Sequence, residues 1–293
     1  MRTGFIGLGN MGAPMAGNLA AAGHEVFGFD PADVSAEGIT RVGAVADAVD
    51  GMDAVITMLP DGGALDAVYA EIVPRGKVGT LFVDCSTVDI DSATAAHRGA
   101  TAAGLLAVDA PVSGGVRGAG AGTLTFMVGG TREAFERAEP LLKLMGERIV
   151  HCGEGGAGQA AKLCNNMLLG ISMIGTCEAF ALGEKLGLEA DRLFEVLSTS
   201  SGSCWSVNTY CPVPGVGPRS PADDGYAAGF AAALMLKDLR LGQGAAERVG
   251  AATPMGLKAS ALYERLVDRE GGDKDFSAML PLLSASARGQ LED

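Results

Sequence analysis

The chain has 293 residues, of which 48% are hydrophobic and 19% charged, a composition typical of a compact globular protein with one or two domains. Its formal net charge of -13 and isoelectric point near 4.7 argue against nucleic acid and against an anionic membrane as partners. The six cysteines form no C-x-x-C pair, and His24, His97 and His151 belong to no metal-binding motif, so we expect reduced thiols and no metal.

The chain begins with a strand-like run, Thr3–Ile6, so we expect no secretory signal and a cytoplasmic protein. A glycine turn with the spacing G-x-G-x-x-G follows this strand. In such a turn the first glycine permits the bend, the second lets a pyrophosphate approach, and the third lets the next helix pack closely. The N–H groups at the start of that helix would face the phosphates. We therefore predict dinucleotide contacts from Gly7, Leu8, Gly9, Asn10, Met11 and Gly12.

A second strand, Glu25–Asp30, ends on an acidic residue near the spacing expected for the group that binds the adenosine ribose. The carboxylate of Asp30 would accept hydrogen bonds from two ribose hydroxyls and repel a 2′-phosphate, and no arginine directly follows it. We therefore predict NAD as the cofactor, with NADP less favoured. The alternative is a structural strand–helix–strand unit that holds no ligand.

Two further buried strands begin at Ala54 and Leu81 and are predicted to end at the sheet edge where ligands bind. Leu59, Pro60 and Thr87 come at or just after these strand ends, and we predict that they contact the cofactor. Thr87 is an equally good candidate for capping the next helix.

A further strand, which includes Val108, runs into the turn Ser113-Gly114-Gly115 at the same edge. Such a turn presents a hydroxyl and successive backbone N–H groups, and it suits a carboxylate better than a polyphosphate because no lysine accompanies it. An ordinary turn is the alternative, since serine and glycine favour turns.

The glycines around Gly155 open a segment of good helix formers that continues without a polar face to Leu182. We predict a long helix buried in a core rather than a membrane span, because Lys162 and Glu178 bracket the uncharged run. Lys162 and Asn166 are four residues apart and therefore share a helix face. A buried lysine is costly to keep without a function, although its amine could also extend to solvent at the helix end.

The alternation of strands and helices stops near this helix, so we predict two domains. Residues 1–161 would form a doubly wound, mostly parallel α/β domain, and residues 162–293 an all-α domain. The irregular segment Ser198–Gly215 carries Trp205, the only tryptophan, and Tyr210. It is expected either to form a lid or pocket wall or simply to cover packed side chains.

Lys237 and Asp238 fall within a helix expected over residues 230–249. They would form either a local surface ion pair or, on a sharper hypothesis, bring a second buried lysine to the site. Thr253 is predicted to cap another helix, with Pro254 at its first position.

Four motifs together carry a resemblance to a known family. In chain order they are Gly7-Leu-Gly9-Asn-Met-Gly12-Ala-Pro-Met-Ala, Asp109-Ala-Pro-Val-Ser113-Gly-Gly, Gly156-Ala-Gly-Gln-Ala-Ala-Lys162-Leu-Cys-Asn-Asn166 and Lys237-Asp238-Leu. With them the chain resembles the β-hydroxyacid dehydrogenase family over nearly its whole length. The resemblance implies an N-terminal Rossmann domain, a helical domain joined to it by one long helix, and a homodimer or homotetramer built on the helical domain.

The resemblance also implies roles for particular residues. In the family, the lysine that matches Lys162 is catalytic and the lysine that matches Lys237 lies near the nicotinamide. The loop from Cys204 to Gly215 favours 3-hydroxyisobutyrate over tartronate semialdehyde as substrate, although Ser203 stands where some relatives carry a basic residue. We expect a supporting role for Asn166, and substrate contacts from Ser113, Gly114, Gly115, Trp205, Tyr210 and Asp238.

The expected chemistry can also be argued from the residues. Oxidation of an alcohol to an aldehyde removes a hydride, which NAD accepts, and a proton, which the protein must move. A free lysine, with a pKa of about 10.4, is a poor base near neutral pH, and burial at a helix start would lower that value. We expect Lys162 to exchange the hydroxyl proton and Asn166 to hold Lys162 or the substrate hydroxyl.

Other functions stay open at this point. The same site would suit L-serine, another short β-hydroxy acid or tartronate semialdehyde, because one methyl or amino group changes binding by only ~1–3 kcal/mol. Decarboxylating oxidation of 6-phosphogluconate would need a cationic phosphate site, and no arginine cluster is seen. A non-catalytic NAD-binding module is a different class, and the presence of Lys162 argues against it. A role in valine breakdown follows from the family if 3-hydroxyisobutyrate is the substrate.

Overall fold

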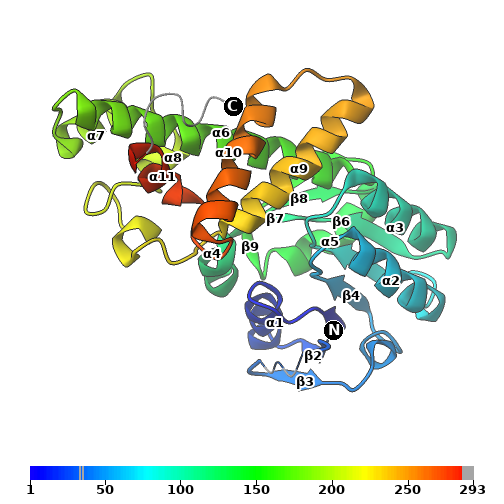
Figure 1. Ribbon diagram of the computed structural model, residues 1–293. Helices are drawn as coiled ribbons and strands as arrows, with labels where there is room; N and C mark the ends of the chain where they lie inside the picture. The colour runs from blue at the N-terminus through cyan, green and yellow to red at the C-terminus, as the bar shows by residue number, and fades with distance from the viewer. Residues whose placement is uncertain (33, 35, 286–293) are drawn as a thin grey trace. The chain divides into compact units, whose positions relative to one another are not determined.

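The computed structural model describes residues 1–32, 34 and 36–285 and divides the chain into two compact units (Figure 1). The first unit is Met1–Lys162 and the second is Leu163–Asp293. The division falls inside helix α6 (Ala157–Lys185), one residue after the boundary that we expected from the sequence.

The first unit is built on a nine-stranded sheet in the order β3-β2-β1-β4-β5-β6-β8-β7, with β9 paired to β8. All neighbours from β3 to β6 pair in parallel, whereas β8 runs antiparallel to β6 and β7 and parallel to β9. This is the mostly parallel sheet that the sequence predicted. The strands are β1 (Arg2–Ile6), β2 (Glu25–Phe29), β3 (Ile39–Arg41), β4 (Ala54–Thr57), β5 (Leu81–Asp84), β6 (Leu106–Asp109), β7 (Val112–Ser113), β8 (Leu124–Gly129) and β9 (Gly146–Gly153).

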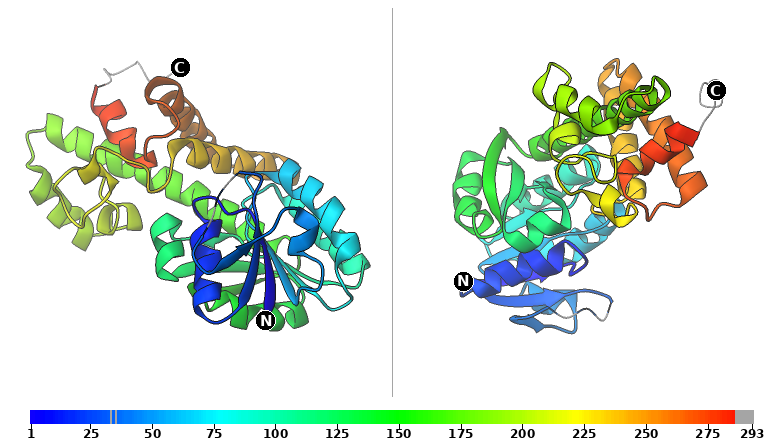
Figure 2. Two further views of the ribbon diagram at one scale, coloured as in Figure 1. Left: turned by 90° about the horizontal axis from the view of Figure 1, so that it is seen from below. Right: turned by 90° about the vertical axis from the view of Figure 1, so that its left-hand side faces the viewer.

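Helices cover both faces of this sheet (Figure 2). Neighbouring strand residues face opposite ways, so Phe5 and Ile6 of β1 belong to different apolar clusters. One cluster includes buried residues of α1, α4 and α5, and the other includes those of α2 and α3. The order of the strands reverses beside β1, the place where doubly wound sheets bind ligands. The helices are α1 (Gly12–Ala21), η1 (Val45–Ala48), α2 (Gly62–Ile72), η2 (Val73–Arg75), α3 (Ile90–Ala102), α4 (Gly115–Ala121) and α5 (Arg132–Leu142).

The described part of the second unit is helical. Its core joins α6 to α9 and α10 through side chains such as Met173, Leu239 and Tyr263, none of which is exposed. Beyond α6, the helices are α7 (Ala190–Thr199), α8 (Trp205–Asn208), η3 (Pro221–Asp224), α9 (Ala232–Val249), α10 (Pro254–Glu270), η4 (Phe276–Ala278) and α11 (Met279–Ala285).

Helix α6 is not buried on all sides, and in this respect the sequence-based expectation was wrong. It is long and apolar enough to span a membrane by length and composition, and half of its most apolar window is buried inside the fold. Leu168 and Leu182 are 63% and 60% exposed, and Gly175 between them is also exposed. These three residues are seven apart, which places them on one stripe of the helix.

Two expected helix caps also differ from the structure. Thr253 precedes α10, but its hydroxyl lies 3.0 Å from Gln243 Oε1 and does not cap the helix. At the start of α3 the capping side chain is Asp89, which accepts the N–H of Ser92 at 2.8 Å, so Thr87 does not cap this helix.

Candidate active site

The glycine turn after β1 has the three properties that dinucleotide binding requires. Gly7 has a φ of +94°, and a Cβ atom there would overlap the carbonyl oxygen of Met58. A Cβ atom at Gly12 would overlap the carbonyl oxygen of Gly7, so this glycine lets α1 approach the strand. At Gly9, by contrast, a Cβ atom would meet nothing within 4 Å. The space beside Gly9 is therefore free for a pyrophosphate.

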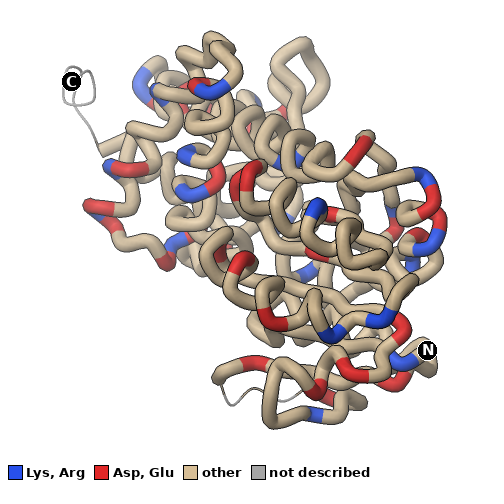
Figure 3. Tube along the Cα trace, turned by 90° about the vertical axis from the view of Figure 1, so that its right-hand side faces the viewer, with Lys and Arg blue, Asp and Glu red and all other residues tan. Residues whose placement is uncertain are grey.

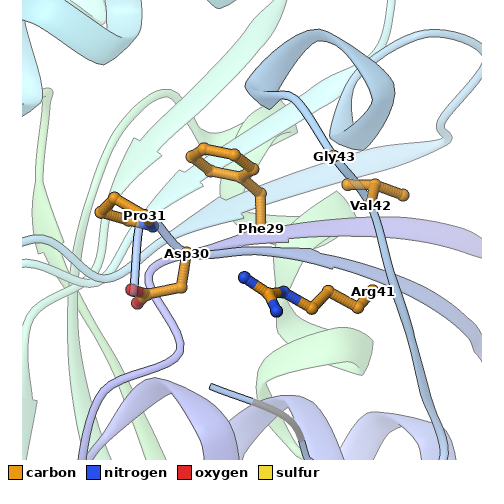
Figure 4. A pocket seen from close by; sticks show the side chains of 6 residues that line it. All are labelled: Phe29, Asp30, Pro31, Arg41, Val42 and Gly43. Atoms are coloured by element: carbon orange, nitrogen blue, oxygen red, sulfur yellow. The ribbon is translucent and has the colours of Figure 1, made fainter. Parts of the chain in front are cut away.

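Asp30 follows β2 and is tied to this turn. Its Oδ2 accepts the N–H of Leu8 at 2.7 Å, and its Oδ1 accepts the N–H of Ala32 at 2.8 Å. Each carboxylate oxygen has a second lone pair, so ribose hydroxyls could still donate to Asp30. A pocket of about 480 Å³ opens beside it (Figure 4), lined by Phe29, Asp30, Pro31, Arg41, Val42 and Gly43.

Arg41 is the residue of this pocket that sequence reasoning missed. No arginine follows Asp30 directly, but β3 pairs with β2 and brings in Arg41 from eleven positions later. The sequence signal before it was the β-branched pair Ile39-Thr40, and two residues are too few to predict a strand.

A buried carboxyl group links the ends of β4 and β5. Asp84 Oδ1 accepts the hydroxyl groups of Ser86 at 2.5 Å and Thr57 at 2.8 Å, and Ser86 Oγ accepts the N–H of Leu59 at 2.8 Å. Burial raises the pKa of Asp84 to about 6, against the opposing effect of these hydrogen bonds. The expected cofactor contacts Leu59, Pro60 and Thr87 thus adjoin one network, which the sequence did not reveal.

Gln159, in the first turns of α6, holds the backbone on both sides of Thr87. Its side chain is fully buried, its Nε2 donates to the carbonyl of Ser86 at 2.7 Å, and its Oε1 accepts the N–H of Val88 at 3.3 Å. The start of α6 therefore fixes the loop that we expect to contact the cofactor.

Asp109, at the end of β6, caps helix α6. Its carboxylate accepts the N–H of Gly156 at 2.7 Å and that of Gln159 at 2.8 Å. Burial raises its pKa, although these backbone hydrogen bonds oppose the change. A Cβ atom at Gly158 would overlap the carbonyl oxygen of Met127, so this helix start must contain glycine to come so near to the sheet.

Lys162 follows Gln159 by three residues in the same helix. The residue is only 6% exposed, and its Nζ donates to the carbonyl of Val112 at 2.7 Å. Its amine therefore does not extend into bulk solvent. Val112 directly precedes Ser113, and Gly114 and Gly115 follow with positive φ angles of 133° and 62°. The structure thus brings Lys162 next to the turn expected to bind a carboxylate.

In the second unit, Asn166 belongs to a buried polar network. Its Nδ2 donates to Asp238 Oδ2 at 2.5 Å, and its Oδ1 accepts from Asn165 at 2.9 Å. Lys237 Nζ lies 3.5 Å from Asp238 Oδ1, and the Asp238 side chain is only 4% exposed. The pair is therefore not an ion pair on an exposed face. Asn166 lies one helical turn from Lys162 along α6.

The loop with Trp205 and Tyr210 is firmly anchored. The two rings stack with centroids 4.8 Å apart, and Trp205 is 48% exposed. The hydroxyl of Tyr210 donates to Asp275 Oδ2 at 2.9 Å. Asp275 is fully buried and also accepts four hydrogen bonds, from the backbone N–H groups of Gly229, Phe230 and Ser277 and the hydroxyl of Ser277. These contacts anchor the loop on packed side chains, as in the alternative of ordinary packing, and do not describe a mobile lid.

Metal ligands and charge clusters add nothing to this site. Among the residues that the structure describes, no group of three or more His, Cys, Asp or Glu side chains could hold a metal ion, and all six cysteines are free. On the face shown in Figure 3, basic and acidic positions are interspersed.

Comparisons with known proteins show which family the chain is similar to. Residues 2–153 match the model for the NAD binding domain of 6-phosphogluconate dehydrogenase, and residues 156–283 match that for the NAD-binding of NADP-dependent 3-hydroxyisobutyrate dehydrogenase. A probable 3-hydroxyisobutyrate dehydrogenase of Mycobacterium tuberculosis is 48% identical over 288 residues, which are 97% of this chain and 98% of that protein. The chain belongs to the β-hydroxyacid dehydrogenase family.

A second relative and a solved structure are also similar over almost the whole chain. An NAD-dependent L-serine dehydrogenase of Pseudomonas aeruginosa is 48% identical over 95% of this chain and 96% of its own length. The solved structure of the M. tuberculosis 3-hydroxyisobutyrate dehydrogenase with L-serine superposes with a TM-score of 0.92, at 47% identity over 97% of this chain and all of that one. The family membership, the fold class, and NAD as the cofactor are thereby confirmed.

Proposed function

We propose that this protein oxidises 3-hydroxyisobutyrate to methylmalonate semialdehyde with NAD, as a step of valine catabolism. The observation that carries the proposal is the buried amine of Lys162, held by the carbonyl of Val112 one residue before Ser113. A non-catalytic module would have no use for such an amine. Support for the substrate comes from the relatives named 3-hydroxyisobutyrate dehydrogenase at 45–48% identity.

Different residues of the chain would bind the substrate, transfer the proton and support the site. The hydroxyl of Ser113 and the N–H groups of Gly114 and Gly115 bind the substrate carboxylate and so orient the carbinol carbon. Lys162 Nζ accepts the hydroxyl proton in oxidation and returns it in reduction. Its hydrogen bond to Val112 fixes the direction of the amine, and Asn166 supports the site from the next turn of α6. Bound NAD supplies the acceptor for the hydride.

The remaining predicted residues complete this proposal. Gly7 to Gly12, Asp30, Leu59, Pro60 and Thr87 bind the cofactor, with Lys237 near the nicotinamide, while Trp205, Tyr210 and Asp238 contact the substrate. We also propose a cytoplasmic protein, consistent with its free cysteines, and a homodimer or homotetramer formed through the helical unit, whose α6 exposes Leu168 and Leu182.

Replacement of the lysine tests the proposal. In Lys162→Met, kcat should fall by about 10²–10⁴-fold, as expected for a lost acid–base group, while NADH binding measured by calorimetry persists. Lys143→Met is a matched control, because Lys143 is an exposed partner of Glu139 on α5. Near-normal turnover by Lys162→Met would refute the mechanism.

L-serine is a second candidate substrate, because a relative named for it is as similar as those named for 3-hydroxyisobutyrate. A kcat/KM series over both 3-hydroxyisobutyrate enantiomers, L-serine and 3-hydroxypropionate distinguishes the candidates. A higher value for L-serine would replace the proposed substrate and leave the mechanism intact.

A further inference from the structure

The pocket beside β2 has one acidic and one basic side chain in its wall. Asp30 comes from the end of β2 and Arg41 from the end of β3. In Figure 4 the Arg41 guanidinium extends across the pocket toward Asp30, whose carboxylate points to the other side. Both side chains line this pocket, so both charges would act on a ligand group bound in it.

The position of Arg41 is fixed by the fold. Arg41 is opposite Gly28 in the parallel register, and the N–H of Val42 donates to the carbonyl of Gly28 at 3.0 Å. The Nη2 of Arg41 donates to the carbonyl of Ala32 at 3.1 Å, which directs the guanidinium toward the segment that follows Asp30. A charge held in this way is present before any ligand arrives.

The geometry of Asp30 identifies which part of a dinucleotide this pocket takes. Because Oδ2 of Asp30 accepts the N–H of Leu8, the carboxylate adjoins the glycine turn expected to bind the pyrophosphate. The adenosine ribose is the next group along a dinucleotide, and its hydroxyls would face Asp30. A substituent on the 2′-hydroxyl would then enter the space between Asp30 and Arg41.

We propose that Arg41 sets how strongly this protein prefers NAD over NADP, by placing a guanidinium beside the ribose position that carries the 2′-phosphate of NADP. This inference rests on the cofactor position in the proposed function. Asp30 repels a 2′-phosphate and Arg41 attracts it, whereas NAD carries no such charge. The two opposed charges in an open, solvated pocket make the preference moderate rather than absolute.

Equilibrium binding tests this assignment without relying on turnover. Calorimetric titration of the full chain with NADH and NADPH should show NADPH binding weakened roughly tenfold or more in Arg41→Ala, and NADH binding weakened by less than about threefold. Reduced nicotinamide mononucleotide, which lacks the adenosine half, should bind equally to both proteins. Arg75→Ala, which removes an arginine that pairs with Asp50 at 3.4 Å, is the control for net charge.

Three further variants test the opposition between the two charges. Asp30→Ser should tighten NADPH binding, and Asp30→Ser with Arg41→Ala should lose that gain, while Arg41→Lys should keep most of the affinity of the parent protein for NADPH. Equal losses for NADH and NADPH in Arg41→Ala, or unchanged NADPH binding, would overturn the role of Arg41. Failure of the proposed function would be seen separately, as normal turnover by Lys162→Met.

Discussion

Two side chains in one short stretch of helix, Gln159 and Lys162, hold two segments that are expected to be functional. Lys162 Nζ binds the carbonyl of Val112, beside the turn expected to hold the substrate carboxylate. Gln159, three residues earlier, binds the peptide groups on both sides of Thr87, which is expected to contact the cofactor. We therefore regard Gln159 as a positioning residue for the cofactor side of the reaction.

Replacement of Gln159 by leucine should separate this role from stability. The variant leaves the Ser86 carbonyl and the Val88 N–H buried without their partner, so the loop at Thr87 should shift and KM for NAD should rise about tenfold. Steady-state kinetics with NAD as the varied substrate gives KM and kcat separately, and Gln159→Glu, which keeps the acceptor for Val88, should recover part of the loss.

Asn18→Leu is the matched control, because Asn18 Nδ2 donates to the carbonyl of Ala119 at 2.7 Å elsewhere in the same unit. It should lower thermal stability without raising KM for NAD. An equal rise of KM in both variants would mean that Gln159 acts only through stability.

At the residue scale, the sequence predicted side chains that lie inside short motifs and missed those whose partners are distant. Lys162 and the glycine turn could be found because spacing alone defines them. Gln159 and Ser86 are 73 residues apart, and Arg41 enters its pocket only because β3 pairs with β2. Such contacts depend on the order of strands in the sheet, which residue patterns do not state.

At the scale of elements, α6 has two apolar faces with different surroundings. One face packs on α9, where a Cβ atom at Gly170 would crowd Met235 and Leu239. The other exposes Leu168 and Leu182, and burying one leucine is worth about 1.5–3 kcal/mol. Apolar residues occur on both faces, so the sequence could not distinguish the buried face from the exposed one.

A charged residue on the exposed stripe should therefore disrupt the proposed oligomer. Leu168→Glu should shift the protein toward the monomer in sedimentation velocity, because assembly would bury an unpaired carboxylate. Val78→Glu is the control, since Val78 is 85% exposed in the first unit and lies on no such stripe. An unchanged sedimentation coefficient in Leu168→Glu would show that this stripe is not the interface.

The helices and most strands were predictable because apolar runs alternate with glycine turns along the chain. The exceptions have local physical causes. β3 has three residues and no buried one, so it lacks the apolar signal of a strand. Thr253 is at the position of a helix cap, but its hydroxyl donates to the side chain of Gln243, ten residues away.

For the whole molecule, the site has a consequence for stability. The ends of β5 and β6 carry buried carboxyl groups, and burial raises the pKa of both Asp84 and Asp109. Folding therefore takes up protons at pH values where these groups are ionised in the unfolded chain but protonated in the folded one. The arrangement that fixes Leu59 and Thr87 thus makes the fold less stable at neutral pH than it would be with neutral side chains.

The pH dependence of unfolding should show this effect. The pKa of Asp84 is about 6 in the folded protein against 3.8 for an unperturbed aspartate, so its favourable contribution is complete below pH 3.8 and is lost as pH rises through about 6. This difference in pKa corresponds to about 3 kcal/mol. The free energy of unfolding from urea titrations of the wild-type protein should fall over this range, relative to Asp84→Asn.

The variant Asp84→Asn keeps an oxygen that accepts from Ser86 and Thr57 and removes the titrating proton, so it should be more stable than the wild type above pH 6 and lack this part of the slope. Asp66→Asn, at an exposed position of α2, should keep the wild-type slope and corrects for net charge. Because the variant keeps the oxygen that accepts from Ser86, whose Oγ in turn accepts the N–H of Leu59, KM for NAD in Asp84→Asn at pH 7 should stay close to normal. Parallel pH profiles for the wild type and Asp84→Asn would show that the buried carboxyl group does not titrate in this range.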